Sequence, residues 1–159
     1  MTTFEGETNG KGRRVALVAS RFNGEITDTL VKGAVDALIH HGTDRGDIDV
    51  AWVPGAFEIP MVARRFVEAG VHDAVICLGA VIKGGTYHFE LVANETARAI
   101  MDISAGAGVP VIFEVLATQD LAQAQARAGG SHGNKGWVAA EAALRMVDLL
   151  AQLPKGDPG

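Results

Sequence analysis

A glycine pair, a threonine and a histidine follow a strongly apolar run in the middle of the chain. Gly84 and Gly85 let the backbone approach a ligand closely, and Thr86 is suited to cap a helix that begins after the loop. Free amides and the positive dipole end at such a helix start favour an anion such as phosphate. His88, beside that anion, could exchange protons near neutral pH. The loop predicts a site for phosphate binding and proton transfer, with a merely structural role for His88 as an equally open alternative.

Two further loops carry large aromatic side chains, Phe22 in "RFNGE" (21–25) and Phe57 in "PGAFE" (54–58). An aromatic side chain in a short loop is hard to bury under its own strand. Stacking on a planar ligand or contact with another subunit is therefore predicted. The alternative is that both rings fold back onto the core.

Short β-branched runs alternate with segments of helical period. Strands are expected at 15–20, 48–53, 73–82 and 109–116, and helices at 26–41, 58–69, 118–127 and 137–153, with a third helix in between that includes 95–106. Gly42 and Gly70 are expected to end the first two helices, and Thr118 to cap the fourth. Repeated strand and helix predict the α/β class, with a parallel sheet between two helical layers, a three-layer α/β/α sandwich.

The loops at the two edges of such a sheet differ in composition. Those after the strands, including 83–88 and 117–120, carry the unusual glycines, aromatics and histidine, whereas 41–47 and 69–74 resemble ordinary solvated turns. Ligands of open parallel sheets bind at the carboxyl edge. The candidate site is therefore expected there.

The composition restricts the classes of function. With 159 residues, 48% of them apolar, the chain has the size of one domain, expected over 15–153 between an N-terminal arm (1–14) and a flexible tail (154–159). A net charge of −5 without a basic run argues against nucleic-acid binding. Without a signal segment or an apolar run long enough to span a membrane, the sequence predicts a cytoplasmic protein without membrane contacts.

Other chemistry finds little support. Cys77 lies in an apolar run and is expected to be a buried hydrophobe. His40, His41 and His132 lack the companions and spacing of a metal site and are expected to be solvated. The segment 129–136 follows a helix and has Gly136 where a P-loop needs Ser or Thr. A phosphorylation-dependent receiver would need acidic residues after the first strand, where "ASRFN" has none.

The segments "ASRFN", "DIDVAWVPGAFEIP", "LGAVIKGGTYHFE", "VPVIF" and "ARAGGSHGNKG" together resemble the 6,7-dimethyl-8-ribityllumazine synthase family of riboflavin biosynthesis. The resemblance runs from about Val15 to Leu150 in the family's order and spacing. It implies a flavodoxin-like four-stranded parallel sheet and a cofactor-free condensation of 5-amino-6-(D-ribitylamino)uracil with 3,4-dihydroxy-2-butanone 4-phosphate. It also implies that the segment around Phe4 to Gly6 adds a strand to a neighbouring subunit.

The resemblance further implies a site shared between two subunits, with His88 and Arg127 as its catalytic residues. The implied substrate-binding residues of one chain are Phe22, Asn23, Ala56, Phe57, Glu58, Ala80, Val81, Ile82, Gly85 and Thr86. Phe113, Arg127 and Lys135 would come from the adjacent subunit. Glu114, Ala117, Ala126 and Tyr87 depart from the family's usual residues without removing any of these groups.

The resemblance also implies a homo-oligomer. Members form pentamers, and in some members twelve pentamers build a hollow shell of sixty chains. The link 128–136 keeps the length of shell-forming members and the Gly133-Asn134 pair, which tolerates positive φ, although Gly130 and Ser131 replace Thr and Lys. A sixty-subunit shell is therefore expected, with a free pentamer as the alternative and riboflavin synthase as a candidate partner. A noncatalytic flavin-binding or shell-forming relative is the alternative function.

Overall fold

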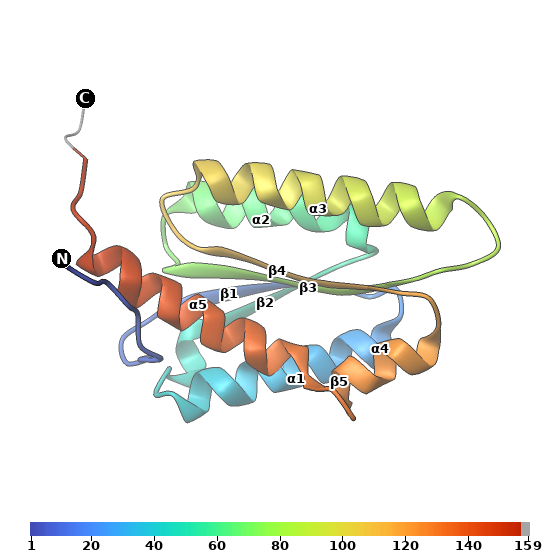
Figure 1. The fold of residues 1–159 in the computed structure, drawn as a ribbon, viewed down its shortest axis with the longest axis horizontal. Coiled ribbons are helices and arrows are strands. Elements are labelled where there is room, and N and C mark those ends of the chain that lie inside the picture. The colour runs from blue at the N-terminus through green and yellow to red at the C-terminus, as the bar shows by residue number, and fades with distance from the viewer. Residues whose placement is uncertain (157–159) are drawn as a thin grey trace.

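The computed structural model describes residues 1–156. Its centre is a parallel sheet with the strand order β2-β1-β3-β4. The strands are β1 (Val15–Ser20), β2 (Ile48–Val53), β3 (Ala74–Ile82) and β4 (Val111–Thr118). In Figure 1, α2 (Ile59–Ala69) and α3 (His88–Gly106) cover one face, while α1 (Gly24–His40), α4 (Leu121–Arg127) and α5 (Lys135–Gln152) lie on the other. The expected three-layer α/β/α sandwich of flavodoxin-like type is confirmed.

The two central strands are apolar on both faces. Side chains of β1 alternate between two core clusters, so Leu17 packs with Leu30 of α1 while Val18 packs with Ile59 at the start of α2. Every residue of β1 is buried. A strand covered by helices on both faces needs a continuous apolar run, because neither side reaches water. The runs in the sequence therefore indicate the sheet correctly.

Several helix boundaries differ from those expected. The helix α3 begins at His88, directly after the glycine-rich loop, and contains the expected 95–106 segment. Thr118 does not cap α4, because its backbone is still part of β4 and pairs with Ile82. The cap is Asp120, whose Oδ1 accepts a hydrogen bond of 2.8 Å from the amide of Gln123. A threonine at the end of a buried strand and one before a helix look alike in sequence.

The link between α4 and α5 is a small antiparallel ribbon of β5 (Ala128–Gly130) and β6 (Gly133–Asn134). Neither strand was expected from the sequence, because both are too short to show a period. Gly133 has the positive φ expected of the pair, at 72°, but Asn134 has a φ of −109° and caps α5 instead.

The N-terminal arm packs against α5 of its own chain. The amide of Glu7 donates to Oδ2 of Asp148 at 2.9 Å, and Nε2 of Gln152 donates to the carbonyl of Glu5 at 2.8 Å. Pairing of this arm with a neighbouring subunit stays a prediction. Of the expected tail, 154–156 has no regular structure and 157–159 lies outside the described residues.

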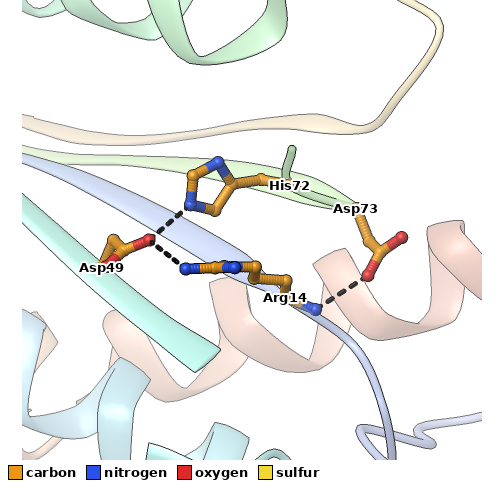
Figure 2. A network of polar contacts seen from close by, with 4 residues as sticks. All are labelled: Arg14, Asp49, His72 and Asp73. Atoms are coloured by element: carbon orange, nitrogen blue, oxygen red, sulfur yellow. Dashed lines mark hydrogen bonds and ion pairs between the residues drawn. The ribbon is translucent and has the colours of Figure 1, made fainter. Parts of the chain in front are cut away.

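A polar network ties the strands together at the amino edge of the sheet, as Figure 2 shows. Oδ2 of Asp49 lies 2.7 Å from Nε2 of His72 and 3.7 Å from a guanidinium nitrogen of Arg14, and Oδ2 of Asp73 accepts from the Arg14 amide at 2.7 Å. His72 is only 8% exposed. The expectation of an ordinary solvated turn at 69–74 is therefore wrong, because the turn carries a buried side chain whose partner lies on β2.

Two glycines at helix ends allow a test of backbone geometry. Gly70 caps α2 with a φ of 66°, whereas Gly106 ends α3 without a positive φ, and a Cβ at either position would meet no atom within 4 Å. We expect Gly70→Ala to lower the free energy of unfolding by about 1–2 kcal/mol, because an L-residue is strained in the left-handed region. Gly106→Ala should be neutral or slightly stabilising. Equal losses in urea unfolding would contradict this explanation.

Candidate active site

A cleft of about 730 Å³ opens at the carboxyl edge of the sheet, where the sequence predicts a ligand. It lies between the loops that follow β1, β2 and β3 and the first turns of α3. Nine of the implied substrate-binding and catalytic residues line it: Phe22, Ala56, Phe57, Glu58, Ala80, Val81, Ile82, Thr86 and His88. They come from segments up to 66 positions apart, and the parallel sheet brings them together because its strand ends share one edge.

The two aromatic side chains stand at the cleft with most of their surface free. Phe22 is 71% exposed and Phe57 is 63% exposed. The alternative that both fold back onto the core is therefore wrong. A ring held by a short loop beside an apolar cleft can stack on a planar ligand.

Asn23 joins two sides of the cleft without lining it. Its Nδ2 donates a hydrogen bond of 2.9 Å to the carbonyl oxygen of Ala80, the residue near the end of β3. Its backbone has a φ of 57°, which asparagine tolerates better than most residues. Asn23 therefore fixes the loop that carries Phe22 against the end of β3, a role that sequence reasoning missed.

The loop at 83–88, for which the sequence predicts phosphate binding, differs from its expected geometry in one detail. The N-cap of α3 is Tyr87 and no side chain caps this end, so the expectation that Thr86 caps the helix is wrong. The exposed His88 is the first helical residue, and the uncapped amides of this turn remain available to an anion. Among the described residues, none would come within 4 Å of a Cβ on Gly84 or Gly85, so packing within the chain does not require glycine there.

Phe113, Arg127 and Lys135 do not line the cleft. Phe113 is 44% exposed on the edge strand β4, while Arg127 ends α4 and Lys135 begins α5. In the β5-β6 ribbon Ala128 pairs with Asn134, so Arg127 precedes one paired residue and Lys135 follows the other. Arg127 Nη1 donates to the carbonyl of Gln123 at 3.0 Å.

Other reactive groups carry no competing site. Burial raises the pKa of the Cys77 thiol to about 12, which confirms a buried structural cysteine and disfavours a thiolate. His41 is not solvated as expected, because its Nε2 lies 2.9 Å from a carboxylate oxygen of Glu141. Within residues 1–156, no three His, Cys, Asp or Glu side chains are grouped to hold a metal. No helix in this range is long and apolar enough to cross a membrane.

Glu114, one of the departures from the family, gives a pH-dependent prediction. Burial raises its pKa, and the charge of Lys135 partly offsets that effect. The folded chain therefore favours the protonated carboxyl, so ionisation at higher pH costs stability. We expect Glu114→Gln to raise the thermal unfolding midpoint at pH 7, with the gain disappearing as the pH falls below about 4.

Glu141→Gln is the matched control, because the pKa of Glu141 is shifted in the opposite direction, to lower values. Hydrogen bonding from His41 leads the causes that lower the pKa of Glu141, and a bond from Trp137 acts in the same direction. Its ionised form therefore contributes stability above its usual pKa, which is lost as the pH falls through the lowered value. Glu141→Gln should lower the midpoint at pH 7 and matter less in acid. A Glu114→Gln gain that stays constant between pH 7 and pH 4 would contradict the assignment.

The comparisons with known proteins identify the family and agree with the architecture. The family model described as 6,7-dimethyl-8-ribityllumazine synthase matches residues 12–151. A protein of Gemmatimonas aurantiaca named 6,7-dimethyl-8-ribityllumazine synthase is 51% identical over 158 residues, which cover 99% of this chain and 96% of the relative. The chain therefore belongs to the 6,7-dimethyl-8-ribityllumazine synthase family.

Proposed function

We propose that the chain condenses 5-amino-6-(D-ribitylamino)uracil with 3,4-dihydroxy-2-butanone 4-phosphate to 6,7-dimethyl-8-ribityllumazine, the penultimate step of riboflavin biosynthesis. Family membership supports this reaction. The observation that carries it is the cleft itself, which is lined both by the exposed aromatic residues Phe22 and Phe57 and by the loop residues Thr86 and His88. A planar substrate and an anionic one both find matching groups there.

The reaction needs binding, orientation and proton transfer. The amine of the pyrimidine attacks the ketone and forms an imine with loss of water, phosphate then leaves, and ring closure releases a second water. His88 serves as the proton donor and acceptor for these steps, because it lies at the cleft beside the loop assigned to phosphate. Gly85 and Thr86, with the helix-start amides, hold the phosphate group.

The remaining cleft residues orient the pyrimidine. Phe22 stacks on its ring and Asn23 holds that loop in place. The ribityl chain lies against the second loop, and backbone groups at the end of β3 meet the ring edge. The residues assigned to these two contacts are Ala56, Phe57 and Glu58 for the ribityl chain, and Ala80, Val81 and Ile82 for the ring edge.

Phe113, Arg127 and Lys135 complete the site of an adjacent subunit. Their position outside the cleft of their own chain supports this assignment. Arg127 is suited to the phosphate, because a planar guanidinium donates paired hydrogen bonds to phosphate oxygens. The protein then works only as a homo-oligomer, and the exposed ring of Phe113 on the edge strand lies at the contact between subunits.

The purified protein mixed with both substrates tests the proposed reaction. Lumazine fluorescence and released phosphate should rise together and in equal amounts. Tight flavin binding without turnover would instead identify the noncatalytic relative.

A shell of sixty chains, built from twelve pentamers, is the expected assembly. The ribbon at 128–134 keeps the link short, and Asn134 fixes the start of α5 on α1, so the final helix has one defined angle. Light scattering and electron microscopy should show a uniform hollow particle. A uniform species of about five chains in several buffers would establish the pentamer instead. Addition of riboflavin synthase tests whether that enzyme associates with the particle.

A further inference from the structure

Asn134 joins the start of α5 to the middle of α1 through a single amide group. Its Oδ1 accepts hydrogen bonds from the amides of Gly136 at 2.9 Å and Trp137 at 3.4 Å. Its Nδ2 donates at 2.9 Å to the carbonyl oxygen of Thr29 in α1. Both ends of this half-buried amide are therefore satisfied, which makes its orientation unique.

Two glycines make room for this contact. A Cβ on Gly33 of α1 would lie 2.3 Å from Oδ1 of Asn134, and a Cβ on Gly136 would lie 1.9 Å from the carbonyl oxygen of Leu30. Neither distance is possible without movement of the helices or of Asn134. We call Asn134, Gly33 and Gly136 the interlock.

The interlock holds the ribbon that carries two proposed active-site cations. Asn134 pairs with Ala128 in that ribbon, so Arg127 precedes one paired residue and Lys135 follows the other. A shift of Asn134 therefore moves Lys135 directly and Arg127 through the ribbon. The interlock and both cations lie outside the cleft of their own chain, so such a shift leaves that cleft intact.

We propose that Asn134 is a positioning residue: through the interlock it sets the spacing of Arg127 and Lys135 that the phosphate group in the adjacent subunit's site requires. This role rests on the proposed function. It differs from ordinary stabilisation because it acts on one substrate only. Loss of the interlock should weaken binding of the phosphate substrate. Binding of the pyrimidine, which contacts the residues of the cleft, should stay unchanged.

The test disturbs Asn134 from the outside. Gly33→Ala presses on the Asn134 amide without altering a residue assigned to substrate, and it should raise KM for the phosphate substrate on the order of tenfold with little change in kcat or in the pyrimidine KM. Asn134→Asp, which keeps the cap acceptor but loses the donor to Thr29, should do the same. Gly106→Ala, a helical glycine in open space, is the matched control and should leave all constants unchanged.

A double variant separates positioning from stability. Asn134→Ser keeps a good N-cap but loses the donor to Thr29, so it should raise KM for the phosphate substrate by itself, and Gly33→Ala added to it should raise this KM no further, because the amide that Gly33→Ala presses on is gone. If the single variants lower only the unfolding midpoint, with KM values unchanged, or if KM for both substrates rises together, the positioning role is wrong.

Calorimetry with inorganic phosphate compares the Asn134→Asp variant with the unaltered chain without the need for turnover. Weaker binding by Asn134→Asp than by the unaltered chain supports the role, and equal binding overturns it. An unaltered chain that forms no lumazine would refute the proposed function by itself, while the phosphate measurement still decides the interlock.

Discussion

Alanine in place of His88 is expected to slow lumazine formation on the order of 10²-fold, a typical contribution of a general acid-base group. The affinity for the pyrimidine should stay nearly unchanged, because the proposed ring contacts are made by Phe22 and the end of β3 instead. Single-turnover fluorescence with both substrates at saturation measures the chemical steps directly. The loss is smaller if uncatalysed imine formation carries part of the flux.

Two further variants make the His88 experiment specific. His88→Asn keeps a polar side chain of similar size but cannot exchange the proton, and should be as slow as His88→Ala. Tyr87→Phe removes only a hydroxyl from the neighbouring exposed side chain, which does not line the cleft, and should react at the normal rate. Unchanged single-turnover rates in His88→Ala would remove this residue from the mechanism.

The fold follows from the sequence because its main signals are local. The continuous apolar runs of β1 and β3 and the helical period between them are visible within short windows, and burial on both faces explains them. Exposure of Phe22 and Phe57 was predictable for the same reason, since a short loop offers a large ring little cover. The edge that carries the cleft then follows from the parallel order of the strands.

The features that could not be predicted from the sequence depend on partners distant along the chain. The turn that holds His72 gives no sign that its side chain is buried against Asp49, 23 positions earlier on another strand. Asn134 likewise contacts Thr29, 105 positions away, and its two-residue strand is too short to show any period. Such contacts become visible only when the chain is folded.

The proposed contribution of a neighbouring subunit to the site was predictable only through the resemblance. Nothing in the spacing of Phe113, Arg127 and Lys135 relates them to the cleft, and the structure of one chain leaves them outside it. The contacts of a site that a neighbouring subunit completes cannot be seen in the structure of a single chain. The ribbon relates the two cations in one respect, because the residue after Arg127 pairs with the residue before Lys135.

Arg127→Ala is expected to weaken binding of the phosphate substrate by about 1.5–3 kcal/mol, the usual contribution of a charge-assisted hydrogen bond. That loss corresponds to a KM about 10- to 150-fold higher for this substrate, with the pyrimidine KM little changed. Arg127→Lys keeps the charge without the paired donors, so its KM for the phosphate substrate should lie between those of the unaltered chain and of Arg127→Ala. Arg98→Ala, which removes an exposed arginine paired with Glu95 outside the cleft, is the control for lost charge.

Mixing two defective chains tests the shared site most directly. His88→Ala retains Arg127 and Arg127→Ala retains His88, so an interface with the two chains in the right order contains one complete site. In a ring assembled at random from equal amounts of both, about a quarter of the interfaces have that order. Co-refolded mixtures should therefore recover about a quarter of the normal rate, whereas the two proteins assembled separately and then combined should not. Failure of co-refolded mixtures to exceed the separate proteins would place Arg127 and His88 in the same chain's site, or Arg127 in none.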